Sequence, residues 1–89
     1  MIARHYILKG QVQGVGFRYF TYKVGHELGI KGWVRNLWNG DVEIHAEGND
    51  EALQQFLDRI KAGPHYAVVE NVRVDEVEME YHPDFSIEG

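Results

Sequence analysis

The chain has 89 residues and ordinary hydrophobic (44%) and charged (26%) contents, so we expect one soluble globular domain over residues 1–89. The absence of cysteine excludes disulfides, thiolate metal ligands and thiol nucleophiles and fits the reducing cytoplasm, where we expect the protein to act. A net charge of −5 argues against general nucleic-acid binding, although residues 1–40, with a balance of +5, could hold one small anion.

Residues 1–9 are rich in β-forming side chains and predict a first strand that Gly10 ends. Its early Arg4 interrupts any apolar signal segment, and no later apolar run is long enough to span a bilayer, so we expect no membrane association. A loop with three glycines follows at residues 10–16. A helix that Gly29 caps comes next. Its apolar face is predicted to contain Phe17, Phe20, Val24 and Leu28.

Residues 31–37 and 41–47 predict two strands joined by a tight turn, and the second strand alternates apolar and polar side chains, with His45 on the polar side. A two-residue turn at 39–40 would set charged side chains opposite apolar ones. A three-residue loop at 38–40, ending in a left-handed glycine, avoids this conflict and is therefore preferred. The register that follows pairs Val34 with Ile44 and Asn36 with Val42.

Asn49 or Asp50 begins a second predicted helix, which has acidic residues in its first turn and basic residues in its last. Gly63 and Pro64 end it. Its apolar face is predicted to contain Ala52, Leu53, Phe56, Leu57 and Ile60.

Residues 68–81 predict a long strand with a bulge or break at 75–76, and residues 85–87 predict a short final strand. The order is therefore β-α-β-β-α-β plus a terminal strand. This order predicts an α+β fold, the ferredoxin-like split βαβ sandwich, with an antiparallel sheet and two helices on one face. Fold alone does not decide function.

The glycine loop and the helix start form a candidate anion site. Glycines let successive backbone N–H groups turn inward, and the first helical turn adds partial positive charge. Arg18 lies in that turn, and its planar fork of donors suits two oxygens of one phosphate. Tyr19 replaces the third glycine of the dinucleotide fingerprint, and the P-loop sequence is absent. A tight turn beside a solvated Arg18 remains an equally open interpretation of this pattern alone.

Asn36 is the second unusual residue. Asparagine is depleted in strands, and an unpaired amide inside a protein costs free energy. Two interpretations stay open for Asn36: a local hydrogen bond at the end of the hairpin, or an amide that orients a water molecule or a substrate oxygen.

Two motifs resemble the signatures of the acylphosphatase family. Residues 10–18 have the form Gly-x-Val-Gln-Gly-Val-x-Phe-Arg and resemble the first signature. Residues 32–36, Gly-Trp-Val-Arg-Asn, followed by Gly40, Val42 and Gly48, resemble the second at matching spacing. The resemblance extends from residue 4 to the C-terminus, on a chain of the family's usual length.

The resemblance implies a ferredoxin-like hydrolase that converts acyl phosphates to a carboxylate and inorganic phosphate without a metal or cofactor. It implies that Arg18 and Asn36 are catalytic, Arg18 by binding the substrate phosphate and Asn36 by holding the attacking water. The expected phosphate-binding residues are Gln13, Gly14, Val15, Gly16, Phe17 and Arg18. The expected partners are the small-molecule acyl phosphate and the phosphate product, with no nucleic acid, no membrane and a monomeric state.

The remaining polar residues suggest no second site. The five histidines are scattered, and no pair has metal-ligand spacing on a helix face, so no metal site is expected. The acids between residues 75 and 80 are interpreted as a mostly solvated face. Among other functions, an RNA-binding module lacks the expected aromatic motif. A regulatory anion-binding domain could share the same loop, and similar domains occur in larger carbamoyl-transfer proteins.

Overall fold

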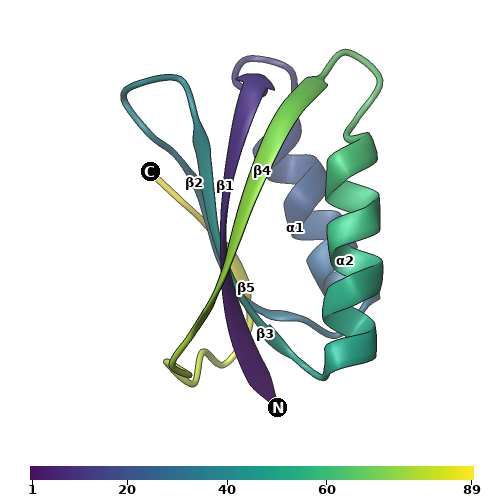
Figure 1. Ribbon diagram of the computed structural model, residues 1–89, viewed down its shortest axis with the longest axis vertical. Coiled ribbons are helices and arrows are strands. Elements are labelled where there is room, and N and C mark those ends of the chain that lie inside the picture. Colours follow the sequence, from purple (N-terminus) through teal and green to yellow (C-terminus); the bar gives the residue numbers. More distant parts are fainter.

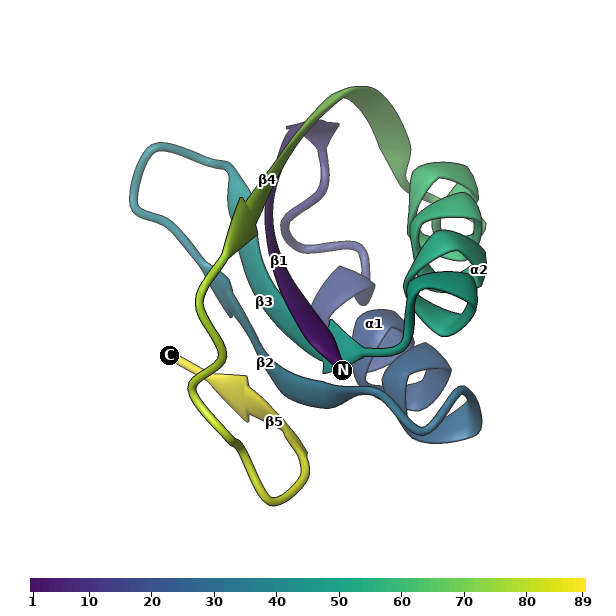
Figure 2. The ribbon, with the colours of Figure 1, turned by 60° about the horizontal axis from the view of Figure 1, so that its bottom comes forward.

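A computed structural model describes all of residues 1–89 and shows a five-stranded sheet with two helices covering one face (Figure 1; Figure 2). In chain order the elements are β1 (Ile2–Gln11), α1 (Phe17–Glu27), β2 (Lys31–Asn36), β3 (Val42–Gly48), α2 (Asp50–Ala62), β4 (Val68–Val77) and β5 (Phe85–Glu88). The predicted order of elements and the α+β ferredoxin-like class are confirmed. Neither helix has the length and apolar character that a membrane crossing requires.

The strands lie in the order β4-β1-β3-β2-β5. The first four pair antiparallel, as expected for the sheet, but β5 pairs parallel with β2. The chain reverses direction between β4 and β5 and crosses to the opposite edge, where β2 already runs opposite to β4 (Figure 2). The sheet is therefore mixed, and the segment that ends the chain lies beside β2.

The hydrophobic core fills the space between the sheet and the helices. The rings of Tyr6 and Phe56 meet edge to face, with their centroids 5.6 Å apart. The ring of Phe85 in β5 packs against that of Phe56, with centroids 6.0 Å apart. The predicted helix faces are confirmed, with their centres fully buried and their margins partly buried. The fully buried helix residues from those faces are Phe17, Val24, Leu53, Phe56 and Ile60. Each such side chain contributes roughly 1.5–3 kcal/mol on burial.

The β2–β3 hairpin has the predicted register, with Val34 opposite Ile44 and Asn36 opposite Val42. The three-residue loop 38–40 is also confirmed, because the N–H of Leu37 donates to the carbonyl of residue 41 at 2.9 Å and Gly40 has a φ of 96°. Asn36 therefore lies on the core-facing side, at the last paired position of β2.

The irregularity predicted within β4 lies elsewhere. Pairing with β1 is regular through residues 75 and 76, and the register shifts where Lys9 and Gly10 face Asn71 and Val69, which leaves Glu70 as the extra residue. The strand ends at Val77 rather than at residue 81. The change in the apolar pattern that led to the predicted break has another cause. It reflects the exposure of β4, which is an edge strand with a sheet neighbour on one side only.

The polar face of β3 is more deeply buried than its alternation suggests. His45 and Glu47 are 2% and 1% exposed. The connection between β4 and β5 lies over them, and the Glu47 carboxylate accepts hydrogen bonds from three consecutive backbone N–H groups, at residues 80, 81 and 82. Periodicity assigns a side chain to a face, but it does not show which distant segment covers that face.

Candidate active site

The loop between β1 and α1 has backbone donors that the protein does not use. Gly14 and Gly16 have left-handed backbone, with φ of 74° and 78°, which glycine adopts at no steric cost. No N–H group of residues 13–16 donates to another part of the protein, and the first amides of α1 have no helical acceptor. Free amides in such a turn, beside the positive end of a helix, form an anion-binding concavity.

Arg18, in the first turn of α1, is the only arginine of the chain without an Asp or Glu partner. Each of the others forms an ion pair at 2.5–2.9 Å: Arg4, Arg35, Arg59 and Arg73. The Arg18 side chain makes one hydrogen bond, from Nη1 to the carbonyl oxygen of Gly89 at 3.1 Å. Its other N–H donors are free to bind an external anion.

A pocket of about 270 Å³ lies beside the loop and Arg18. It joins the β1–α1 loop and the start of α1 to the end of β2 and to β5. Its lining consists of Val12, Gly14, Gly16, Phe17, Arg18, Tyr19, Asn36 and Ile87. The volume lies below the range of roughly 300–1,000 Å³ that is typical of pockets for larger ligands, so it favours a small molecule.

Asn36 contributes an unsatisfied acceptor to this pocket. Its Oδ1 atom is buried and has no hydrogen-bond partner. An unpaired buried carbonyl costs about 1–3 kcal/mol, which a donor from water or from a ligand would recover. The local hairpin hydrogen bond considered from the sequence is not formed by this atom.

Gln13 connects the loop to the β2–β3 hairpin. Its Nε2 donates to the carbonyl oxygens of Leu37 and Asp41, both at 2.7 Å, and these two residues flank the hairpin loop just beyond Asn36. The role of the Gln13 side chain was not predicted. Neither Gln13 nor Val15 lines the pocket, whereas the other expected site residues do: Gly14, Gly16, Phe17, Arg18 and Asn36.

Sequence reasoning also missed three residues of the pocket wall, Val12, Tyr19 and Ile87. Tyr19 follows Arg18 directly and is largely exposed. Ile87 lies opposite Val34 in the parallel pairing of β5 with β2. The order of strands in a sheet cannot be read from local patterns, so nothing in residues 85–87 alone could indicate this neighbourhood.

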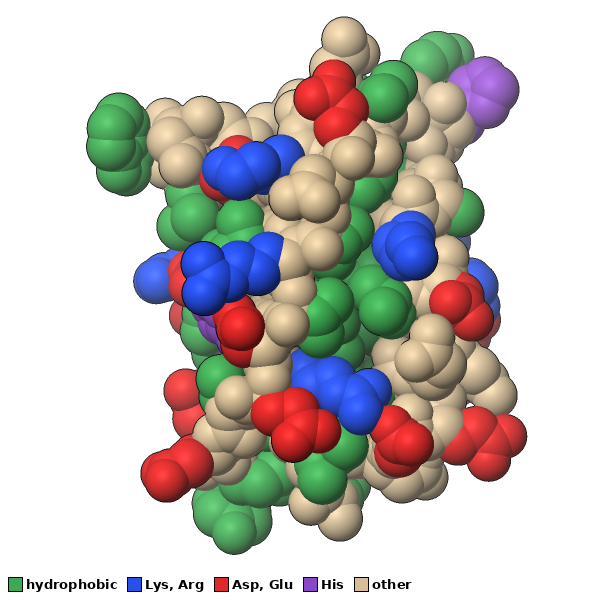
Figure 3. All heavy atoms as spheres, in the orientation of Figure 1, with side chains coloured by type: hydrophobic (Ala, Val, Ile, Leu, Met, Phe, Trp, Pro, Cys, Tyr) green, Lys and Arg blue, Asp and Glu red, His purple; other side chains and the backbone are tan.

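A second hollow, of about 340 Å³, lies between α2 and β4, where apolar side chains are visible in Figure 3. It is larger than the Arg18 pocket, but Lys61 is its only cation. Its apolar lining residues are Leu57, Val69, Val72 and Val74. Because it has no arginine and adjoins neither a glycine-rich loop nor the start of a helix, it is the poorer candidate for an anion site.

The sequence that builds the Arg18 pocket matches a known family. The acylphosphatase family model covers residues 4–87, which include the glycine loop, Arg18 and Asn36. The chain belongs to the acylphosphatase family. The predicted resemblance is therefore confirmed over nearly the whole chain.

Individual acylphosphatases are similar to this chain over 89% or more of their own lengths. The acylphosphatase of Thermotoga petrophila is 52% identical over 80 residues, which cover 90% of this chain and 89% of the relative. The acylphosphatase of Archaeoglobus fulgidus is 48% identical over 87 residues, 98% of each chain. The crystal structure of acylphosphatase from Bacillus subtilis has a TM-score of 0.98 at 41% identity and covers 100% of both chains. This membership supports a hydrolase that acts on acyl phosphates.

Proposed function

We propose that this chain hydrolyses carboxyl–phosphate mixed anhydrides by in-line attack of a water held by Asn36 on a phosphate bound by the glycine loop and Arg18. One observation carries the proposal: a single small pocket is lined by the one arginine that has no acidic side-chain partner and by the residue with an unpartnered carboxamide oxygen. Family membership supports the reaction, and the contacts within the pocket support the role of each residue.

The phosphate lies among the backbone N–H groups of residues 13–17 and the Arg18 guanidinium. These amides have no acceptor within the protein, so binding an anion adds hydrogen bonds without breaking existing ones. The fork of Arg18 contacts two equatorial oxygens and stabilises the charge that develops on them as the phosphoryl group transfers. The donors are fixed before the substrate arrives, which is how electrostatic stabilisation lowers a barrier.

Asn36 positions the water. Its Oδ1 accepts one O–H of the water and so directs an oxygen lone pair toward phosphorus. The carboxamide does not take up a proton at neutral pH, so Asn36 orients the nucleophile rather than deprotonating it. The water proton passes to a phosphate oxygen as the P–O bond to the acyl group breaks.

The leaving group explains why so few side chains suffice. A carboxylate, whose conjugate acid has a pKa of about 4, departs without receiving a proton, so no general acid is needed. Phosphoryl transfer depends mainly on positioning and charge stabilisation, which the loop and Arg18 supply. We therefore propose that hydrolysis proceeds without a metal ion.

The test is release of inorganic phosphate from a simple acyl phosphate such as benzoyl phosphate. We expect turnover that a chelator leaves unchanged and that inorganic phosphate inhibits competitively. Arg18→Lys keeps the positive charge but loses the fork, so kcat/KM should fall by about 100-fold or more. Arg73→Lys, at an exposed arginine paired with Asp75, is the matched control and should retain full activity.

Two outcomes would contradict the proposal, and they have different meanings. Phosphate binding without turnover of any acyl phosphate would make the chain a regulatory anion-binding domain and would end the proposal. Full activity in Arg18→Lys would refute the role of the guanidinium while leaving the reaction itself in place.

A further inference from the structure

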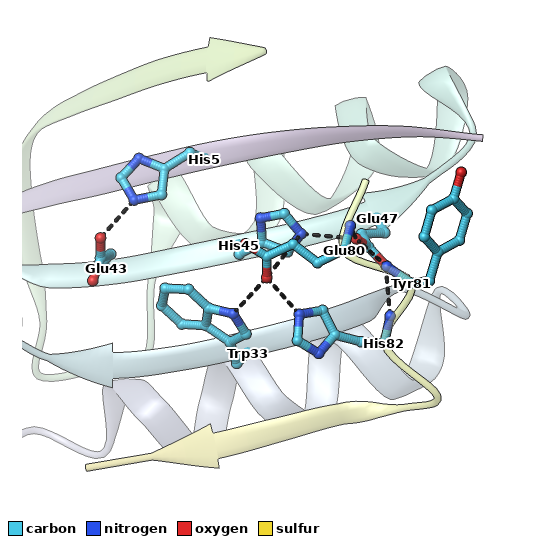
Figure 4. A network of polar contacts seen from close by, with 8 residues as sticks. All are labelled: His5, Trp33, Glu43, His45, Glu47, Glu80, Tyr81 and His82. Atoms are coloured by element: carbon cyan, nitrogen blue, oxygen red, sulfur yellow. Dashed lines mark hydrogen bonds and ion pairs between the residues drawn. The ribbon is translucent and has the colours of Figure 1, made fainter. Parts of the chain in front are cut away.

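Four ionisable side chains form a cluster on the sheet face opposite the helices. His45 and Glu47 come from β3, and Glu80 and His82 come from the connection between β4 and β5 (Figure 4). We call these four residues the His/Glu cluster. None of them lines the Arg18 pocket, so the proposed hydrolysis does not explain their arrangement.

The ligand-forming atoms of the cluster converge. The Nε2 atom of His45 lies 2.8 Å from Oε2 of Glu47 and 3.7 Å from Oε1 of Glu80, and Nε2 of His82 lies 2.6 Å from the same Glu80 oxygen. One ligand atom each from His45, Glu47 and His82 lies within 4.8 Å of the other two. Two imidazole nitrogens and one carboxylate oxygen thus lie close enough to share one ion, and the Glu80 carboxylate lies beside the two histidines.

The surroundings hold these groups in orientation. Backbone N–H groups of residues 80–82 donate to the Glu47 carboxylate, and the indole Nε1 of Trp33 donates to Oε1 of Glu80 at 3.3 Å. His45 and Glu47 are almost fully buried, so neither can rotate freely into solvent. Carboxylate ligands that are fixed by further hydrogen bonds are characteristic of protein metal sites.

We propose that the His/Glu cluster is a binding site for a divalent transition-metal ion, best suited to Zn²⁺. Two imidazoles and the Glu47 carboxylate provide three ligands of the types that zinc accepts, a water molecule completes a tetrahedral set, and the charges of Glu47 and Glu80 balance those of the ion. Ligands at about 2.0–2.1 Å from the ion lie about 3.3 Å apart, so the 2.8 Å pair of His45 and Glu47 opens by roughly half an ångström. Each neutral imidazole then carries its ring proton on Nδ1.

The site joins β3 to the segment that leads into β5. Without an ion, the same side chains satisfy one another through hydrogen bonds, so folding does not depend on the metal. With an ion, the connection over β3 is held by one further ligand, His82, and by the attraction between the ion and the Glu80 carboxylate. The ion therefore stabilises the fold and takes no part in the hydrolysis proposed above.

Titration of the metal-free full chain with Zn²⁺, followed by calorimetry, tests the site. We expect one ion per chain and a melting temperature that rises with Zn²⁺ concentration. His82→Gln should weaken binding by more than about 100-fold, since loss of even a supporting partner typically costs 10–100-fold. His82 is only partly buried, so the variant is expected to fold. His65→Gln, at an exposed histidine outside the cluster, should bind as the unmodified chain does.

NMR of the histidine ring nitrogens identifies the ligands directly. Zn²⁺ should shift the Nε2 resonances of His45 and His82 and leave those of the other three histidines unchanged. Absence of one-to-one binding, unchanged affinity in His82→Gln, or shifts at His65 instead would each overturn the proposal. None of these results bears on phosphate release, so the two proposals fail independently.

Discussion

Arg18 and Asn36 share hydrogen-bonding capacity that the rest of the protein leaves unused. Every other arginine has a carboxylate partner, and the Asn36 oxygen is one of two buried side-chain polar atoms without a partner, the other being the Tyr6 hydroxyl. Tyr6 lies in the core, where burial raises its pKa to about 12. Asn36, in contrast, lines the Arg18 pocket, so its unpaired oxygen lies beside the proposed substrate site.

Asn36→Ala removes the acceptor that we assign to the water. We expect kcat to fall by roughly 100-fold, in line with losses of single positioning groups, while the inhibition constant of inorganic phosphate changes little. Steady-state kinetics with phosphate as inhibitor measures both quantities. Asn71→Ala, at an exposed asparagine of β4, is the control. A loss of phosphate affinity with unchanged kcat would instead make Asn36 a binding residue.

The sequence predicted Arg18 and Asn36 because each conflicts with its local setting: an arginine at a glycine-rich helix start and an asparagine inside a strand. The same reasoning could not find the bonds of the Gln13 side chain, because its acceptors lie more than 20 positions away. It also could not show that His45 and His82 lie together, because they meet only after the β4–β5 connection crosses the sheet.

At the scale of elements, the loop that would bind phosphate and the hairpin that carries Asn36 are separate units. Gln13 joins them through two hydrogen bonds to backbone carbonyls. In the mechanism that we propose, the distance between the phosphate and the attacking water therefore depends on this side chain, although it does not line the pocket.

Gln13→Ala should loosen the loop from the hairpin without removing any proposed substrate contact. We expect kcat/KM to fall roughly 10- to 100-fold, the size of effect that follows small misplacements of reacting groups. The assay is phosphate release, with Gln54→Ala on the exposed face of α2 as the control. Unchanged kinetics would show that the loop holds its position without Gln13.

Glu47 performs a comparable connecting role on the opposite face, between β3 and the β4–β5 connection. Burial alone would raise the pKa of its carboxyl group, but hydrogen bonds from His45 and from the backbone of residues 80–82 outweigh burial and lower the pKa to about 2. The folded state therefore binds this proton more weakly than the unfolded chain, whose carboxyl has a pKa near 4.5.

This difference makes stability depend on acidity in a defined window. The contribution of Glu47 is fully present above pH 4.5 and is lost as the pH falls toward 2; the shift corresponds to about 3 kcal/mol. Urea denaturation as a function of pH should show a stability decrease in this window that is clearly smaller in Glu47→Gln. Glu78→Gln, at an exposed carboxylate, should follow the unmodified chain. Parallel curves for all three proteins would contradict the assignment.

At the scale of the molecule, periodicity and turn chemistry predicted the elements, the hairpin register and the two-layer architecture. They did not predict that β5 pairs parallel with β2, because that depends on where the connection after β4 leads. Nor did they place the register shift at Glu70, since the apolar pattern of an edge strand reports exposure as much as pairing.

Ligand binding at the Arg18 pocket should stabilise the whole fold. With inorganic phosphate at ten times its dissociation constant, the free energy of unfolding rises by about 1.4 kcal/mol. For a domain of this size, that raises the melting temperature by roughly 5–10 °C. Calorimetry should show this increase in the unmodified chain and a much smaller one in Arg18→Lys at the same phosphate concentration. Equal increases in both proteins would place the phosphate elsewhere.

The presence of Ile87 in the pocket wall has a consequence for synthesis on the ribosome. Gly14 and Ile87 line one cavity but lie near opposite ends of the sequence. A growing polypeptide therefore exposes the glycine loop early and completes the cavity only after β5 has been translated and has left the exit tunnel. Until then, a nascent chain has the half of the site that we propose binds the anion, without the wall that encloses it.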